Sequence, residues 1–173
     1  EGKLGGPLVH RERSNTHLPE LGDRVRDEQG GPFLTLARSG DGSAVALPET
    51  LGSWPTWRDV STYDGKDGPF FKRAQIAAAD LALSGLAPGD DLHRLTLFAD
   101  NLVPHVLRLD GVLEFDDDLV ARIDAERLIE HDSPEEVEIR ACALHAVELL
   151  VAPHPEPTTA AAVDNHLWHR GGG

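Results

Sequence analysis

The 173-residue sequence has one cysteine, three lysines, no methionine and no apolar run long enough to cross a membrane. A single cysteine, Cys142, excludes an internal disulfide and favours a reducing compartment, so we expect a cytoplasmic protein. The N-terminal residues lack the basic, apolar and small-residue pattern of a secretory signal. Because methionine is missing even at position 1, we expect the sequence to be a piece of a longer protein.

Basic residues are also scarce, with 16 Lys and Arg against 30 Asp and Glu, which gives a net charge of -14. So acidic a surface repels polyphosphates, and binding to long nucleic acids is therefore disfavoured. A small anionic ligand would need a few cations to converge locally. A composition of 40% hydrophobic and 27% charged residues is typical of a globular domain with its own core.

Hydrophobic periodicity predicts one all-α domain over residues 1–173, since no convincing alternating strand is found. Residues 64–69 (DGKDGP) are interpreted as a loop. Ser133, Pro134 and Glu136 form a capping-box signal that predicts a helix start. Helix 72–83 is expected to turn Ile76, Ala79 and Leu83 inward. The predicted helices cover residues 18–28, 32–38, 44–51, 72–83, 99–109, 116–128, 133–151 and 158–169.

Asp100 is the first candidate functional residue, because it follows the apolar stretch 95–99 and precedes the apolar helix 102–109. A carboxylate in apolar surroundings loses hydration and needs compensation. One interpretation is a helix N-cap that accepts backbone N–H groups. The other is a functional carboxylate beside an apolar pocket, with Phe98 as a wall. The two are compatible, since helix N–H groups keep an acid ionised.

Lys72 and Arg73 begin a predicted helix directly after two phenylalanines. Two cations at a helix N-terminus oppose the helix dipole unless an anion is present. A bound phosphate would resolve this conflict, and an ion pair with a nearby acid such as Asp80 would resolve it equally well. Both interpretations stay open from the residues alone.

The last predicted helix carries Asp164, His166, Trp168 and His169. Asp164 and Trp168 are four residues apart and share a face. The spacing of His166 and His169 would suit a metal, but no third ligand lies at motif spacing, so no metal site is predicted. On helix 133–151, Glu138 and Arg140 cannot face each other, and one is expected to point inward to a partner on another helix.

Together these segments resemble the queuosine salvage protein family, the queuosine 5′-phosphate N-glycosylases/hydrolases. The order and spacing of the matching segments carry the resemblance across nearly the whole chain. Stronger matches are 71–76 (FKRAQI) followed by Asp80, 97–104 (LFADNLVP), 111–113, 136–140 (EVEIR) with Glu148, and Asp164 with 167–168; weaker ones are 7–11 with Arg13, and 57–59.

The resemblance implies a helical fold similar to that of DNA glycosylases, in which this chain would be the C-terminal part of a longer protein. It implies hydrolysis of queuosine 5′-phosphate to release queuine, with Asp100 as the catalytic carboxylate. Phe98, Asp164 and Trp168 correspond to substrate-binding positions of the family, and His169 stands where some members have an acid. We add Lys72 and Arg73 as expected phosphate ligands. No metal or cofactor is implied. The alternative is a non-catalytic nucleoside-binding module.

Overall fold

The computed structural model describes residues 21–25, 27, 35, 36, 43–87, 89–153 and 158–172. This part of the chain is mostly helical, with one small two-stranded sheet. The elements, in chain order, are α3 (Ala46–Gly52), β1 (Val60–Tyr63), β2 (Lys66–Pro69), α4 (Lys72–Leu83), the short 3₁₀ helix η1 (Leu92–Arg94), α5 (Leu102–Leu109), α6 (Asp117–Asp124), α7 (Pro134–Val151) and α8 (Ala160–Gly171).

Helices with strong local signals begin and end close to their predicted positions. Helix α4 spans the predicted residues 72–83 and is followed by Gly85 at a φ of 72°. Helix α7 begins after Ser133, whose hydroxyl accepts the Glu136 N–H at 3.3 Å as the capping box requires. Helix α6 ends at Asp124, earlier than predicted. Of the predicted helices 18–28 and 32–38, residues 21–25, 27, 35 and 36 are described and helical, and the remaining residues lie outside the described part.

The prediction of an all-α fold is wrong at residues 60–69, which form an antiparallel hairpin. Val60 pairs with Pro69 and Tyr63 with Lys66, so part of the expected loop is strand β2. Asp64 and Gly65 make the two-residue turn, with φ values of 49° and 72°. Positive φ at both positions gives the twist that joins two adjacent strands, and an Asp-Gly pair adopts it readily.

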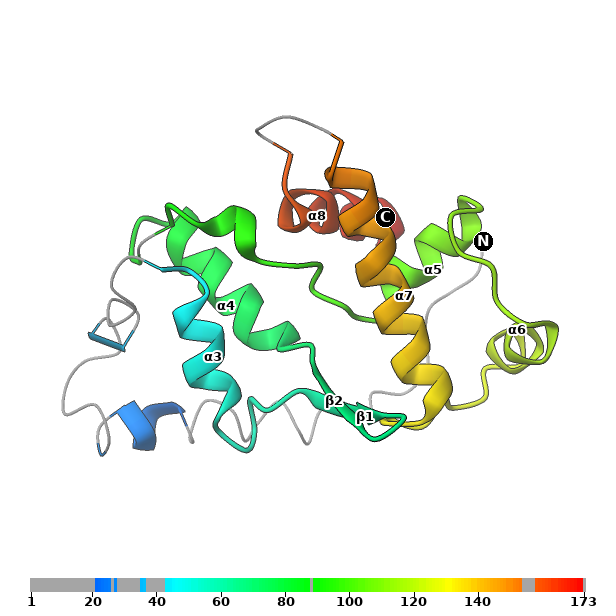
Figure 1. Cartoon of the computed structure of the whole chain (residues 1–173), viewed down its shortest axis with the longest axis horizontal. Helices are drawn as coiled ribbons and strands as arrows, with labels where there is room; N and C mark the ends of the chain where they lie inside the picture. The colour runs from blue at the N-terminus through cyan, green and yellow to red at the C-terminus, as the bar shows by residue number, and fades with distance from the viewer. Residues whose placement is uncertain are drawn as a thin grey trace.

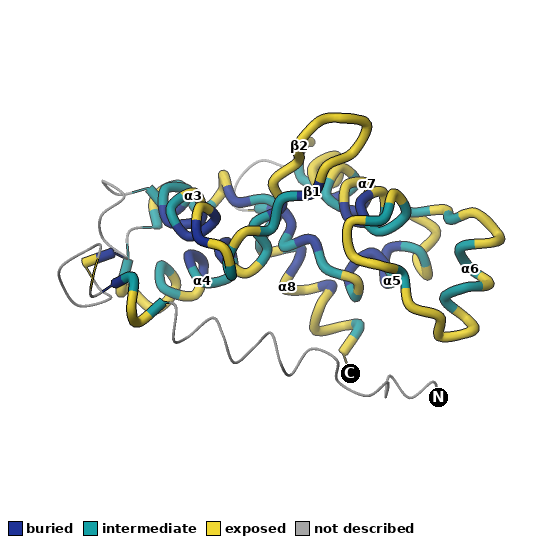
Figure 2. The backbone as a smooth tube through the Cα atoms, turned by 90° about the horizontal axis from the view of Figure 1, so that it is seen from below, coloured by how far each residue is buried: buried dark blue, intermediate teal, exposed yellow. Residues whose placement is uncertain are grey.

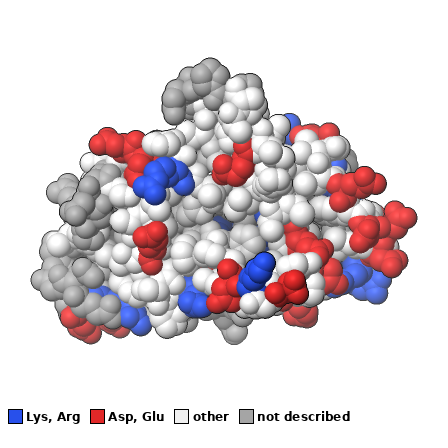
Figure 3. Space-filling model, viewed as in Figure 1, with Lys and Arg blue, Asp and Glu red and all other residues white. Residues whose placement is uncertain are grey.

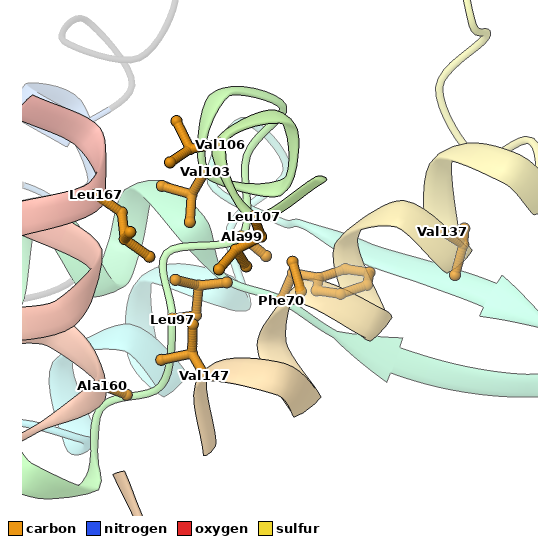
Figure 4. Packing of buried hydrophobic residues seen from close by; sticks show 11 residues of the cluster. Phe70, Leu97, Ala99, Val103, Val106, Leu107, Val137, Val147, Ala160 and Leu167 are labelled. Atoms are coloured by element: carbon orange, nitrogen blue, oxygen red, sulfur yellow. The ribbon is translucent and has the colours of Figure 1, made fainter. Parts of the chain in front are cut away.

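Two hydrophobic clusters build the core. One joins α3 and α4 through residues that include Leu51, Trp54 and Ala74. The other lies between α5, α7 and α8 and includes Leu97 and Val147. Figure 4 shows Leu97 and Ala99, on the segment before α5, among side chains from α5, α7 and α8. Figure 2 shows the buried stretches along the middle of the molecule and the exposed hairpin and α6 at its margins.

The arrangement of the helices places the starts of α4 and α5 between these two clusters. Figure 1 shows α3 beside α4 at one end, and α8 against α5 and α7 in the other part of the molecule. Strand β1 contacts α7, so the hairpin links the two parts. None of the described helices is both long and apolar enough to span a membrane.

Candidate functional site

Burial alternates along residues 95–100, which lie between η1 and α5. Leu95, Leu97 and Ala99 are buried to 2% exposure or less, and the residues between them are only partly buried. The apolar set enters the core, and Phe98 and Asp100 both belong to the less buried set.

Asp100 caps helix α5 and forms an ion pair at the same time. Its Oδ1 accepts the N–H groups of Leu102 at 2.9 Å and Val103 at 3.0 Å. The next residue, Pro104, has no N–H, so Asp100 receives both donors that these first three helical residues offer. Its Oδ2 lies 3.4 Å from Lys72 Nζ, and the aspartate side chain is 9% exposed. The interpretation of Asp100 as a helix cap is thus confirmed, and its second oxygen is left to face a cation.

Lys72 reaches Asp100 because the chain turns sharply just before α4. Phe71 has a φ of 49°, and the two phenylalanines enter different cores: Phe70 the cluster with α5, α7 and α8, and Phe71 the cluster with α3. The Lys72 N–H donates to Asp59 Oδ2 at 2.9 Å. The anion at this helix start is therefore Asp59, and the ion-pair partner of the Lys72 side chain is Asp100, instead of the suggested Asp80.

Asp164 brings a second acid to the same place from helix α8. It is 6% exposed, and its Oδ1 accepts the Phe98 N–H at 3.1 Å. Burial and the nearby charge of Asp100 raise the pKa of Asp164 to about 6, while the Phe98 N–H and the charge of Lys72 act in the opposite direction. Two carboxylates and one ammonium group therefore interact at the junction of α4, α5 and α8.

The structure shows Arg73, Trp168 and His169 in contact with residues other than these three. The Arg73 guanidinium donates to the carbonyl oxygen of Thr56. Trp168 is 48% exposed, one helical turn after Asp164. The ring of His169 contacts the edge of Trp168 at 5.3 Å between centroids, and its Nδ1 lies 2.7 Å from the Asn165 carbonyl oxygen.

One group of potential metal ligands occurs in the part of the chain that the structure describes. His131, Asp132 and Glu136 bring ligand-type atoms within 4.8 Å of one another at the exposed start of α7. Glu136 is already engaged by Arg140 Nη1 at 3.2 Å. Neither His166 nor His169 belongs to this group, and nothing here distinguishes it from an exposed acidic surface.

Sequence reasoning missed two buried polar links that hold the site segments. Gln75 on α4 donates to the Phe70 carbonyl at 2.9 Å and accepts the Thr96 N–H at 2.9 Å. Arg140 on α7 reaches the Asp59 carboxylate at 2.7 Å. The Asp59 pKa is raised by burial, but its bond to Arg140, the charge of Arg140 and the Lys72 N–H bring it below its usual 3.8. One of Glu138 and Arg140 was predicted to point inward to a partner on another helix. Arg140 is the buried one, but its partner lies before β1 and not on a helix.

Charge is unevenly distributed over the face seen in Figure 3. Acidic side chains gather around α6, at one end of the molecule, and the middle of this face is mostly uncharged. Helix α6 begins within the run Asp116–Asp118, which contributes to this concentration.

The fold and site define a mostly helical protein in which two aspartates and a lysine meet beside a partly exposed aromatic residue. The family model described as queuosine salvage protein matches residues 6–172. The chain belongs to this family.

Curated relatives carry the name queuosine 5′-phosphate N-glycosylase/hydrolase. One from Sphaerobacter thermophilus is 40% identical over 162 residues, which cover 89% of this chain and 50% of the relative. The Bos taurus relative is 33% identical, with 94% of this chain and 52% of the relative covered. For the Mus musculus relative the identity is 30%, with the same two coverages of 94% and 52%. The chain therefore spans about half the length of these relatives.

Proposed function

We propose that the protein containing this chain hydrolyses the N-glycosidic bond of queuosine 5′-phosphate and releases queuine for reuse in tRNA modification. The observation that carries the proposal is the state of Asp100. One of its oxygens is fixed by two backbone N–H groups, and the other faces Lys72 beside Asp164. The name of the curated relatives supplies the substrate.

A fixed carboxylate suits this reaction because breaking the bond between ribose C1′ and the base nitrogen leaves positive charge on the sugar. Asp100 Oδ2 stabilises that charge, by attack at C1′ or by electrostatic attraction. Water then supplies a hydroxyl to C1′, and its remaining proton balances the charge on the departing base. Queuine is a 7-deazapurine with carbon at position 7, so protonation there is unavailable and charge stabilisation carries more of the barrier.

Asp164 is assigned to the base. Since its pKa is about 6, most of its population is ionised at pH 7. An ionised carboxylate forms a charge-assisted hydrogen bond with the amine that queuine bears on its cyclopentenediol group. Phe98 and Trp168 are placed on either side of the ring system, and the partial exposure of Trp168 leaves its face accessible to a ligand. His169, in edge contact with Trp168, supports that ring.

Lys72 is assigned to the 5′-phosphate, and this role has a consequence for Asp100. In the ligand-free site the ammonium group offsets the charge of Asp100 at 3.4 Å. A phosphate that draws Lys72 away returns the full negative charge of Asp100 to the sugar. Arg73 would join it at the phosphate only by giving up its bond to Thr56.

We further propose features of the whole protein that the resemblance implies. These are a fold like that of DNA glycosylases, a small nucleotide as the substrate and no need of a cofactor. The single cysteine favours a cytoplasmic location, and the net charge of -14 disfavours direct binding of nucleic acid.

The test is release of queuine by the protein in its full natural length, followed by mass spectrometry with queuosine 5′-phosphate as substrate. Asp100→Asn should lower the rate about 100-fold or more, because it removes the charge and keeps the helix cap. Asp116→Asn is the matched control, since Asp116 precedes helix α6 and makes no side-chain cap bond. Undiminished release by Asp100→Asn would remove Asp100 from the mechanism. Substrate binding without release by the unaltered protein would favour the non-catalytic binding module.

A further inference from the structure

A buried ion pair between Asp59 and Arg140 connects the segments that carry the site. Arg140 Nη2 lies 2.8 Å from Asp59 Oδ1 and 2.7 Å from Oδ2. The same guanidinium donates from Nε to the carbonyl oxygen of Ala99, at 3.1 Å. Ala99 directly precedes Asp100, so Arg140 holds the backbone from which the proposed catalytic carboxylate extends.

Asp59 holds the other half of the site through the start of α4. Its Oδ2 accepts the Lys72 N–H at 2.9 Å. Its backbone carbonyl accepts the N–H groups of Phe70 at 2.9 Å and Phe71 at 3.2 Å. The contacts therefore form a closed ring, which runs from Asp59 through Arg140 and the 99–100 backbone to the Asp100 side chain, and returns through Lys72.

The pair has little freedom to adopt another arrangement. The side chains of Arg140 and Asp59 are 8% and 13% exposed. The guanidinium carbon lies 4.0 Å from the centroid of the Phe70 ring, and Nη1 donates to Glu136 at 3.2 Å. A planar guanidinium with several donors in a fixed fork can hold separate acceptors in one geometry, which a lysine ammonium cannot do.

We propose that Asp59 and Arg140 are positioning residues that set the distance and direction between Lys72 and Asp100. An ion pair that served stability alone would need only the contact between α7 and the segment before β1. Here the same side chains also bind the backbone on both sides of the Lys72–Asp100 pair. The catalytic consequence rests on the function proposed above, whereas the geometric claim does not.

Two variants test the proposal in the full-length protein. Asp59→Asn keeps the shape of the side chain and removes its charge. Arg140→Lys keeps the charge but cannot reach Asp59 and the Ala99 carbonyl together, and it takes the place of Asp59→Asn if that variant does not fold. Arg122→Lys and Glu135→Gln are the matched controls, because this pair also joins α7 to a neighbouring segment, at 2.8 Å.

The first readout is geometric and needs no turnover. Lys72 is one of three lysines, so acylation by a small amine reagent can be followed for each lysine by mass spectrometry. Lys66, exposed on the hairpin, is the internal reference. In folded Asp59→Asn the acylation of Lys72 relative to Lys66 should rise about threefold or more, because the ammonium group is no longer aimed at Asp100. Unchanged Lys72 acylation in Asp59→Asn and Arg140→Lys would overturn the proposal.

The second readout separates kcat from KM for queuosine 5′-phosphate at a temperature where every variant is folded. We expect kcat to fall about tenfold to a hundredfold with a much smaller change of KM. A displaced carboxylate stabilises the transition state less well but changes binding of the substrate little. The control variants should keep the kcat of the unaltered protein. A folded Asp59→Asn with unaltered kcat would refute the positioning role in catalysis. If the unaltered protein releases no queuine, the proposed function fails, and Lys72 acylation still decides the geometric claim.

Discussion

Asp164 should reduce the stability of the folded protein at neutral pH. Burial and Asp100 raise its pKa from 3.8 to about 6. A group with a raised pKa binds its proton more tightly in the folded state, so the folded protein loses stability as the pH rises from about 4 to 6. One pKa unit corresponds to about 1.4 kcal/mol, which puts the loss at up to about 3 kcal/mol above pH 6.

The substitution Asp164→Asn removes this loss and keeps an oxygen that can accept the Phe98 N–H. Because Lys72 nearby is partly exposed and solvent screens the charges, we expect a gain of about 2 kcal/mol at pH 7.5. For a chain of this size that gain corresponds to a rise in Tm of about 4–8 °C. At pH 4, where the folded-state carboxyl is already neutral, the rise should be about 1 °C or less. Thermal unfolding by circular dichroism at both pH values measures the difference.

Asp91→Asn is a control of opposite sign. Burial acts to raise the Asp91 pKa, but the N–H of Ala44, the hydroxyl of Ser43 and the charge of Arg94 lower it overall. The stability that Asp91 contributes is present at neutral pH and is lost as the pH falls through its lowered pKa, so its Asn variant should melt lower at pH 7.5. A lower Tm for Asp164→Asn at pH 7.5, or an equal shift at pH 4 and pH 7.5, would refute the reasoning.

Five further substitutions, two of them at Asp100, separate stability from function. Asp100→Asn keeps the acceptor for the two amides of α5 and should leave urea unfolding nearly unchanged, whereas Asp100→Ala should cost about 1 kcal/mol; equal losses would contradict the cap. Gly171→Ala puts a Cβ 2.6 Å from a methyl carbon of Val106 and should lower the unfolding free energy by about 1–3 kcal/mol. In the neighbouring Gly172→Ala the nearest contact of the new Cβ is at 3.4 Å, so the unfolding free energy should change by about 0.5 kcal/mol or less. Similar losses for Gly171→Ala and Gly172→Ala would argue against tight packing of α8 on α5. Trp168→Ala should barely alter the Tm, since the side chain is 48% exposed. It should weaken binding of queuosine 5′-phosphate, measured by calorimetry, by about tenfold. Unchanged affinity would rule out stacking of the base on Trp168.

Local sequence signals predicted the helices well. They did not predict which distant segments pair with each other. Ser133 with Glu136, and Gly85 after α4, are contacts or conformations within a few residues of each other, so the sequence contains them directly. The Asp-Gly turn was an equally local signal, but it was missed because the hairpin is almost entirely exposed and lacks an alternating apolar face.

The inward face of α4 shows why periodicity alone can mislead. The spacing predicted an inward face with Ile76, Ala79 and Leu83. Ala79 is buried and Ile76 partly buried, but Leu83 is 78% exposed. The helix instead packs against α3 through Ala74 and Ala78, whose small side chains let the two helices approach closely. A pattern of large apolar residues does not reveal a contact that alanines make.

The sequence predicted which residues belong to the candidate site, but it did not predict which of them contact one another. Asp100 could be recognised by its apolar neighbours, and the alternation at 95–99, which was overlooked, would have grouped Phe98 with the less buried residues. The pairing of Lys72 with Asp100 and that of Asp59 with Arg140, 81 residues apart, depend on how α4, α5 and α7 pack. No local pattern contains that information.

One oxygen of Asp100 caps helix α5 and the other faces Lys72, and these two contacts restrict which amino acids can occupy position 100. A side chain here must be short enough to reach the two amides at the start of α5, which Asn, Ser and Thr also satisfy. It must also carry a negative charge for Lys72, which Glu would supply from a longer stem that no longer fits the cap. Of the twenty amino acids, aspartate alone meets both requirements, so a change that improves one of them at this position loses the other.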